Sequence, residues 1–416
     1  MQSVIAIQQA IAAGKQTPRQ AIARCFDTIA ANDGELRAIR HRADREAVLA
    51  AADKASGPLA GIGVGVKDIF DSHDMETGYG SPIYDGFRPR ADAAVVAMAR
   101  RAGASIVAKT ATTEFAFLHP TDTRNPHDHA HTPGGSSSGS AAAVAAGMLP
   151  AAFGTQTGGS VIRPAAYCGI AGYKPSFRLL PATGMKTFAW TLDTTGVFAA
   201  GVADAAAFVE GLSGRELTPV APSLQGLRIA LYRSAIDAEA DQPMRNAVAR
   251  AAALATEAGA IVTEVEEPAI LADAREAHAT VQNYEAALSL ASDYALHNAQ
   301  MSGVLSATLE SGRAITPDAY DKARAIARRA RHAATALFDD CDVLLLPSAT
   351  GAAPKGLEST GNPIFAKLWT MTGNPSLNVP GLKDASGLPL GAQMVARFGR
   401  DDVLLSAGAA LQFCLN

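Results

Sequence analysis

One stretch of the sequence, residues 134–168, constrains the fold more than any other. It reads GGSSSGSAAAVAAGMLPAAFGTQTGGSVIRPAAYC and combines Ala and Val runs with five serines and several glycines. The pattern predicts a helix, a strand, a tight turn and a second helix, because small apolar residues can pack into a core while glycines permit turns. Hydroxyl groups beside such turns suit a nucleophile and its oxyanion site. An ordinary buried segment that packs a helix against a sheet would share part of this pattern.

Composition excludes several classes of protein. The 416 residues are 48% hydrophobic and 18% charged, with a net charge of −4, and they form no basic stripe. We therefore expect no nucleic-acid partner. No apolar run reaches about eighteen residues and no secretory leader is recognisable, so we expect a cytoplasmic protein that does not contact a membrane. The four cysteines are widely separated, which favours reduced thiols over a disulfide framework or a zinc site.

The order of predicted elements indicates one large domain over residues 1–416. Residues 1–55 read as helices, and Thr17 and Pro18 form a typical helix start. Strands and helices alternate through a core at residues 56–215, and an αβ unit with a helical region fills residues 216–340. Strands return in residues 341–416, before a closing helix. Because these last strands look like additions to one sheet, we predict an α/β fold, a layered α/β/α domain with a mixed central sheet covered by helices.

Three local patterns give more specific expectations. Residues 94–102 predict a helix, residues 105–109 a strand, and Thr112 the start of another helix. Residues 273–340 predict a wholly helical segment. Its arginine-rich part, residues 313–331, is interpreted as a solvated helix face rather than an RNA-binding surface.

Lys67 is the first candidate catalytic residue along the chain. Residues 61–70 alternate like a strand, which places Lys67 on the same side as Gly63 and Gly65. A lysine at the end of a strand is commonly solvated or paired with an acid. Apolar neighbours would instead lower its pKa, so that it could serve as a base.

Four histidines lie between residues 119 and 131, three of them as His127, His129 and His131. A metal site is one interpretation of this cluster. The segment, however, contains Pro and Asn and lacks the helical spacing of a zinc-binding H-E-x-x-H motif, which favours a solvated loop. We therefore predict no metal and no organic cofactor.

The motifs together resemble those of the amidase signature family. Three of them occur in the family's order: GVKD at residues 65–68, GGSSSGSAAAVAAG at 134–147 and GTQTGGSVIRPAAYCG at 154–169. The similarity covers nearly the whole chain, through the further segments TRNPHDHAHTPGG, KPSFR, LDTTG, DVLLLP, GNPSLNVP and GLPLGAQMVARFG. The resemblance implies the amidase signature fold and an enzyme that cleaves carbon–nitrogen amide bonds.

The resemblance also implies roles for three residues. Ser160 would be the nucleophile, Ser136 a proton relay that follows an unusual cis peptide bond, and Lys67 the base. The reaction would proceed through an acyl-Ser160 intermediate, release ammonia or an amine, and end with hydrolysis by water. Ser137 and Ser138 would then be structural.

The residues beside Ser160 independently suit an oxyanion hole. Thr157, Gly158, Gly159 and Ser160 supply successive backbone N–H groups just before a predicted helix. Such donors stabilise the negative charge of a tetrahedral intermediate, and the loss of one typically raises the barrier by about 3 kcal/mol.

Two departures from the common family pattern concern the substrate. Arg163 lies three residues after Ser160 instead of two, and Gln156 stands where an Asp is usual. The absence of the Asp charge and the changed position of the guanidinium both favour an anionic substrate, because Arg pairs well with carboxylate. Both residues are therefore predicted to bind substrate. This arrangement resembles the malonamidases within the family, which implies a small carboxylate-bearing amide such as malonamate.

Several alternatives stay open at this point. Arg163 could be structural, in a broad-specificity aliphatic or aryl amidase. The chain could also be the A-type subunit of a tRNA-dependent amidotransferase, or a non-catalytic scaffold on the same fold. For the leading interpretation, we expect a small-molecule amide as the partner and allow for a homodimer. The sequence leaves open whether Trp369, Tyr284 or the histidine loop reaches the pocket.

Overall fold

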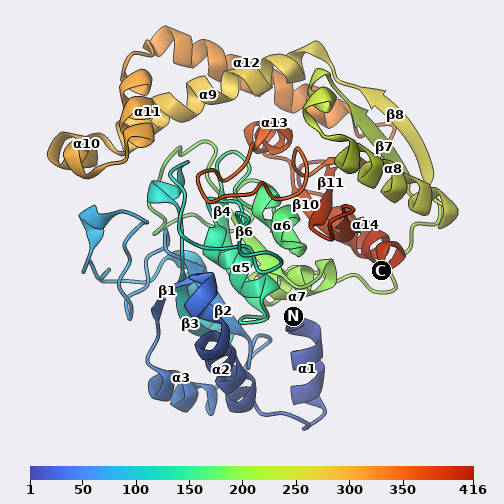
Figure 1. The fold of residues 1–416 in the computed structure, drawn as a ribbon. Helices are drawn as coiled ribbons and strands as arrows, with labels where there is room; N and C mark the ends of the chain where they lie inside the picture. Colours follow the sequence, from blue (N-terminus) through green and yellow to red (C-terminus); the bar gives the residue numbers. More distant parts are fainter.

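A computed structural model describes all 416 residues of the chain. At its centre lies one mixed sheet of eleven strands, in the order β1-β3-β2-β4-β6-β5-β10-β11-β9-β7-β8 (Figure 1). In chain order, the strands are β1 (Ile39–Arg42), β2 (Gly63–Lys67), β3 (Ser105–Thr110), β4 (Ala151–Gln156), β5 (Ala171–Lys174), β6 (Thr194–Ala199), β7 (Arg228–Arg233), β8 (Ile261–Glu266), β9 (Val343–Pro347), β10 (Ser376–Lys383) and β11 (Pro389–Ala396).

Fourteen α-helices surround the sheet. They are α1 (Val4–Ala12), α2 (Pro18–Leu36), α3 (Arg45–Ala52), α4 (Ala94–Arg101), α5 (Ser138–Ala145), α6 (Ile162–Cys168), α7 (Val202–Ser213), α8 (Gln242–Glu257), α9 (Ala269–Ser289), α10 (Ala291–His297), α11 (Gly303–Arg313), α12 (Pro317–Ala336), α13 (Ile364–Thr372) and α14 (Asp401–Leu415).

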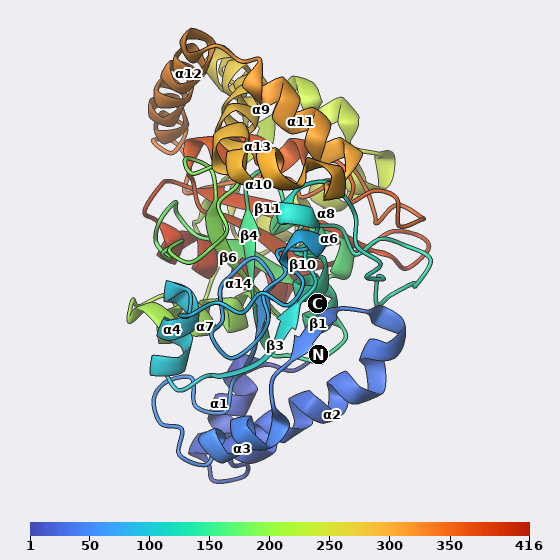
Figure 2. The same ribbon diagram turned by 90° about the vertical axis from the view of Figure 1, so that its left-hand side faces the viewer.

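The helices cover both faces of the sheet. Helices α5 and α6 contact each other and pack on central strands, while α7, α14 and α8 form a second contacting series. The long helices α9 and α12 lie together at one end of the molecule, and α1, α2 and α3 lie at the other (Figures 1 and 2). One cluster of 92 buried hydrophobic residues runs from Val4 to Leu411, so both ends of the chain contribute to the same core. The predicted single α/β domain with a mixed sheet is confirmed.

Helices α2 and α12 each begin with a threonine cap that is followed by a proline. Thr17 caps α2 with its side chain, which accepts from the backbone N–H of Gln20, and the side chain of Gln20 accepts from the N–H of Thr17. This reciprocal capping box satisfies two N–H groups that have no partner within the helix. Thr316 caps α12 in a similar way, ahead of Pro317.

The structure differs from the sequence-based expectations in two places. The all-helical prediction for residues 1–55 missed β1, which pairs antiparallel with β3 at the edge of the sheet. The helix predicted from Thr112 is only a short 3-10 turn, η2 (Glu114–Ala116), in which Phe115 and Ala116 adopt left-handed backbone angles. The hydroxyl of Thr113 donates to the carbonyl of Phe117 and closes this turn, so an α-helix does not propagate.

The strand order brings two functional segments to one edge of the sheet. Strands β2 and β4 are parallel neighbours, with Val66 opposite Phe153. Their carboxyl ends therefore lie side by side, where β2 ends at Lys67 and β4 ends at Gln156. Ligands of α/β sheets commonly bind beyond this edge. No helix has the length and apolar character needed to span a membrane.

Candidate active site

Lys67 and Ser136 meet inside the protein. The Nζ atom of Lys67 donates to the Oγ atom of Ser136 at 2.8 Å and to the Oγ1 atom of Thr155 at 2.6 Å. Lys67 is fully buried, and burial lowers its pKa well below the usual value, against the opposing effect of the Asp193 charge. A buried lysine of lowered pKa can hold a neutral amine that accepts a proton. The peptide bond between Gly135 and Ser136 is cis.

Ser160 lies in the turn between β4 and α6. The backbone N–H groups of Thr157, Gly158, Gly159 and Ser160 donate no hydrogen bond within the protein, and all four residues line one cavity. This turn therefore offers free donors beside a hydroxyl, as an oxyanion hole requires. No hydrogen bond joins Ser136 to Ser160 in this structure, so only the Lys67 half of the predicted relay is connected by a direct bond.

Residues distant in sequence hold this turn in place. His278, on α9, lies with its Nε2 atom 2.8 Å from the carbonyl oxygen of Thr157, and Thr370, on α13, donates to the carbonyl of Gly158 at 3.0 Å. The hydroxyl of Thr157 donates to Asp193 at 2.6 Å. Because these contacts fix the carbonyl groups of the turn, its N–H groups stay available on the cavity side.

The electrostatics around the turn follow from burial. Burial lowers the pKa of His278 to about 4, so the ring is neutral near pH 7 and its Nε2 atom must carry the hydrogen that faces the carbonyl of Thr157. Burial raises the pKa of Asp193 to about 6, although the bond from Thr157 acts in the opposite direction. Asp193 is thus mainly ionised at neutral pH.

Gln156 lies behind the cavity instead of lining it. Its side-chain oxygen accepts from the backbone N–H groups of Val161 and Ile162 at 2.9 and 3.1 Å, and its amide nitrogen donates to Thr370 at 3.1 Å. The side chain is fully buried. The prediction that Gln156 binds substrate is therefore corrected: its polar atoms are occupied in holding the start of α6 beside Ser160.

Arg163 lines the cavity together with Ser160. The guanidinium is 2% exposed, and its Nη2 atom donates to the carbonyl of Gly135 at 2.6 Å and to the hydroxyl of Thr360 at 3.1 Å. Its Nε and Nη1 atoms are buried without any partner. Buried donors without partners are costly, so the guanidinium of Arg163 has hydrogen-bonding capacity that the protein itself does not use.

The cavity has a volume of about 310 Å³ and is positively charged. Lys367, on α13, is its second cation, and it forms no ion pair with a carboxylate. Burial lowers the pKa of Lys367, and the charge of Arg163 lowers it further. The remaining wall combines polar and apolar groups from five segments, namely Ala116, Phe117, Leu118, Phe188, Ala279, Gln282, Asn283, Thr308 and Pro363.

Other candidate residues lie outside this cavity. Trp369 is buried against Tyr232, and Tyr284 stacks on Tyr320. The three clustered histidines have separate partners: His127 contacts the carbonyl of Cys168, His129 contacts Glu35, and His131 contacts Asp128. None of them reaches Ser160.

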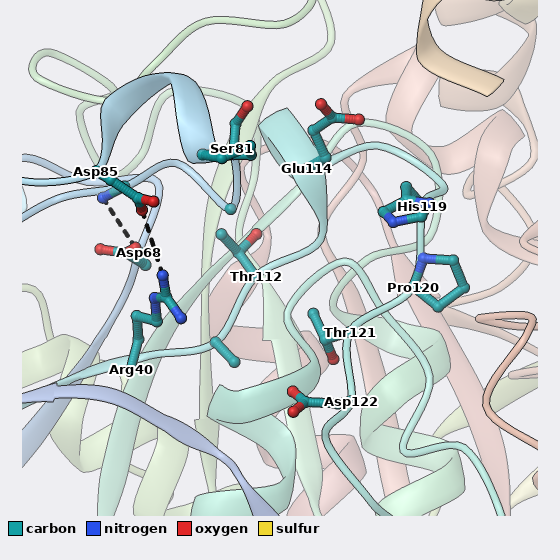
Figure 3. A pocket seen from close by; sticks show the side chains of 14 residues that line it. Arg40, Asp68, Ser81, Asp85, Thr112, Glu114, His119, Pro120, Thr121 and Asp122 are labelled. Carbon is teal, nitrogen blue, oxygen red and sulfur yellow. Dashed lines mark hydrogen bonds and ion pairs between the residues drawn. The ribbon is translucent and has the colours of Figure 1, made fainter. Parts of the chain in front are cut away.

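An acidic cavity of about 270 Å³ has Asp68, the residue after Lys67, in its wall (Figure 3). Its carboxylates are each engaged within the protein, in the pairs Asp68 with Lys109, Asp85 with Arg40, Glu114 with Ser302, and Asp122 with Arg37. Because these carboxylates already have partners within the protein, the cavity beside Ser160 is the better candidate site.

Sequence reasoning missed several residues of the site. His278, Thr370 and Lys367 belong to helices α9 and α13, and no motif marks them. Asp193 had a signal, since it lies in the LDTTG segment that contributed to the family resemblance.

Comparisons with known proteins agree with this geometry. The family model described as "Amidase" matches residues 20–405. The A-type subunit of the glutamyl-tRNA(Gln) amidotransferase of Rhodopirellula baltica is 32% identical over 99% of this chain and 96% of its own length. The structure described as a vestigial protein complex that reveals the origins of an s-triazine catabolic enzyme has a TM-score of 0.92 at 27% identity, with 99% of this chain and 98% of that chain covered. A peptide amidase bound to chymostatin has a TM-score of 0.85 at 30% identity, with 99% and 97% covered.

These relatives overturn the expectation about partners. The curated relatives are named as subunits of an enzyme that acts on a glutamyl-tRNA, and one structural neighbour is described as part of a protein complex. The expectation of no nucleic-acid partner, drawn from the net charge and the lack of a basic stripe, is therefore wrong. The net charge of a chain averages over its whole surface and does not report local patches or the surface of a partner.

Proposed function

Because this chain belongs to the amidase family, we propose that it hydrolyses the carbon–nitrogen bond of a small amide that carries a carboxylate. Ser160 is the nucleophile, Ser136 relays its proton, and Lys67 is the base. The buried contact between Lys67 and Ser136, at 2.8 Å, is the observation that supports this proposal most directly.

The proton path follows from the charge of Lys67. A neutral Lys67 accepts the proton of Ser136 across their contact, and Ser136 takes the proton of Ser160. The Oγ atom of Ser160 then attacks the amide carbon, and the N–H groups of Gly158, Gly159 and Ser160 stabilise the oxyanion. The proton returns to the leaving nitrogen as the carbon–nitrogen bond breaks. Water hydrolyses the acyl-Ser160 ester, giving a carboxylic acid and free Ser160.

Arg163 supports a carboxylate on the substrate. Its Nε and Nη1 atoms keep N–H groups that no protein acceptor uses, and a carboxylate is the strongest acceptor for such a charged donor. Lys367 adds a second positive charge to the same cavity. A malonamate-like acid amide has the required amide and carboxylate within one small molecule.

The substrate class is tested by comparing malonamate, glutamine, propionamide and benzamide as substrates. We expect kcat/KM for the carboxylate-bearing amides to exceed that for the neutral amides, and Arg163→Met to remove that preference while the neutral amides are still cleaved. Equal rates on the neutral amides would favour a broad-specificity amidase with a structural Arg163. Ser160→Ala should abolish turnover of all four without unfolding the protein, and retained turnover would refute the nucleophile assignment.

A second candidate function is the amidase subunit of a tRNA-dependent amidotransferase. The named relatives support it, at 30–33% identity over most of their length. Free glutamine also presents an amide and a carboxylate, so the same cavity suits either substrate. Affinity purification of the tagged chain from its native cells tests this candidate. A stable hetero-complex, with glutaminase activity only in its presence, would favour the subunit function over a self-sufficient amidase.

A further inference from the structure

A second cavity, of about 530 Å³, lies next to α12 and shares no wall residue with the cavity of Ser160. Helix α9 separates the two, since Val281 lines this cavity while Ala279 and Gln282 line the other. Four arginines line it: Arg178, Arg324, Arg328 and Arg331. We call it the arginine cavity. The helices α9 and α12 beside it form the upper end of the molecule in Figure 1.

The positive charge of the arginine cavity is not compensated within the protein. None of its four arginines forms an ion pair, and Asp321 is the only acidic residue in its wall. Burial lowers the pKa of Arg331, and the charge of Arg324 lowers it further. Like charges that face a common hollow repel one another unless an anion lies between them.

The spacing of three arginines suits an anion with several charges. Arg324, Arg328 and Arg331 lie at positions i, i+4 and i+7 of α12, which places them on one face of the helix. With a rise of about 1.5 Å per residue, this row is about 10 Å long. A single carboxylate or sulfate would contact only part of it, whereas a chain of phosphates could contact all three guanidinium groups.

Aromatic residues from another segment also line the arginine cavity. Trp190 is 36% exposed, and Phe177 lies next to it in the cavity. The guanidinium of Arg178 donates to the carbonyl of Trp190 at 2.8 Å and lies 4.7 Å from the centre of the Phe177 ring. Arg178 therefore contacts both aromatic residues, Phe177 through its ring and Trp190 through its backbone carbonyl. An exposed indole beside arginines is a typical platform for a stacked nucleobase.

We propose that the arginine cavity binds a nucleobase together with several neighbouring phosphates, either as a free nucleoside triphosphate or as a single-stranded RNA segment. The phosphates contact Arg324, Arg328 and Arg331, and the base stacks on Trp190. An acidic peptide would use the arginines but would leave the aromatic wall without a matching group. The binding site is separate from amide hydrolysis and does not depend on the proposed substrate.

Tryptophan fluorescence of the full chain tests the proposal directly. Trp369, the other tryptophan, is 1% exposed, so quenching on ligand addition reports on Trp190. The probes are ATP, a short single-stranded oligoadenylate, inorganic triphosphate, adenosine and a glutamate-rich peptide. We expect ATP or the oligoadenylate to bind more tightly than triphosphate or adenosine. If ATP binds more tightly than the oligoadenylate, the ligand is a free nucleotide, and if the oligoadenylate binds more tightly than ATP, the ligand is an RNA segment. The proposal would be overturned if the peptide bound more tightly than both, or if neither ATP nor the oligoadenylate bound.

Variants of α12 provide a matched comparison. Arg328→Gln should weaken nucleotide binding by about tenfold or more, through loss of a charge-assisted contact, and should reduce its salt dependence. Arg329→Gln is the control, because Arg329 lies on the same helix outside the cavity wall. Asp321→Asn should strengthen binding, and Trp190→Leu should weaken ATP binding but not triphosphate binding. Equal losses for Arg328→Gln and Arg329→Gln would show a diffuse surface effect and refute the site, whichever substrate the amidase cavity takes.

Discussion

The amine of Lys67 and the hydroxyl of Ser136 lie 2.8 Å apart in the interior of the protein, although 69 residues separate them in the chain. Lys67 ends β2 and Ser136 precedes α5, so the contact depends on the packing of that helix against the sheet. Thr155, on the parallel neighbour β4, accepts the second hydrogen bond of the amine. These contacts hold the amine of Lys67 at the position where the proposed mechanism needs a neutral base.

Lys67→Met should abolish amide hydrolysis and make the protein more stable. Loss of a general base typically costs about 10²- to 10⁴-fold in rate. The folded state lowers the pKa of Lys67, so at neutral pH the unfolded chain binds more protons, and wild-type stability rises with pH until both states are deprotonated. Thermal unfolding at pH 7 should give a higher Tm for Lys67→Met, with a gap that narrows toward pH 10. A lower Tm across this range would contradict a neutral Lys67.

Lys367→Met should selectively impair carboxylate-bearing substrates. The variant removes one of the two cations of the cavity, so we expect KM for malonamate to rise by about fivefold while propionamide turnover is unchanged. The wild-type KM for malonamate should also rise with ionic strength, and this dependence should weaken in the variant. Lys383→Met, an exposed lysine on β10, is the control. A parallel loss on both substrates would indicate a structural role for Lys367.

The sequence allowed the fold and the family to be predicted because both depend on local patterns. Lys67, Ser136 and Ser160 each lie in a motif of small residues, whose spacing is constrained by a strand end or a turn. His278 gave no such signal, since an isolated histidine on an amphipathic helix is indistinguishable from a core residue. Its contact with Thr157 spans 121 residues and arises only when α9 packs beside the turn.

Two further features of the structure could not be predicted from local patterns. Gln156 was expected to contact substrate because it departs from the family pattern, but an amide can also accept from two backbone N–H groups, which is how it is used here. The arginines of α12 are exposed, in agreement with the solvated helix face that their spacing predicts. The rest of the wall of the arginine cavity, with Trp190 and Phe177, comes from a segment more than a hundred residues away and could not be inferred from helical periodicity.

His278→Gln should change the pH dependence of stability. The pKa of His278 falls from about 6.5 to about 4 on folding, so its contribution is complete above pH 6.5 and is lost as the pH falls toward 4. This loss amounts to about 2 kcal/mol between pH 7 and pH 5. Asp193 acts in the opposite direction, because its pKa is raised to about 6. The free energy of unfolding in urea is therefore measured for wild type and variant at both pH values, and the change with pH in the variant is subtracted from that in the wild type. The same pH dependence in both proteins would contradict a contribution from His278.

Gln156→Leu should destabilise the protein without removing any group from the cavity. The change leaves the buried N–H groups of Val161 and Ile162 without an acceptor, at a cost of about 2 to 4 kcal/mol. Because α6 begins beside Ser160, we also expect a lower kcat. Denaturant unfolding measures the first effect, with the exposed Gln242→Leu as control. If Gln156→Leu changed only KM, a direct contact with substrate would be indicated instead.

Gly159→Ala and Gly158→Ala should have unequal effects, although the two glycines are adjacent. A Cβ atom on Gly159 would lie 2.8 Å from Cβ and 3.2 Å from Cα of Pro363, so the turn or α13 would have to move. A Cβ atom on Gly158 would meet its nearest neighbour, Cε1 of His278, at an ordinary 3.7 Å. Displacement of one oxyanion donor typically lowers kcat by about 10²-fold or more, which we expect for Gly159→Ala, whereas Gly158→Ala should retain most of the wild-type rate. Comparison of kcat for the two purified variants on one amide decides the matter, since equal activity would mean that the N–H groups of this turn do not stabilise the oxyanion.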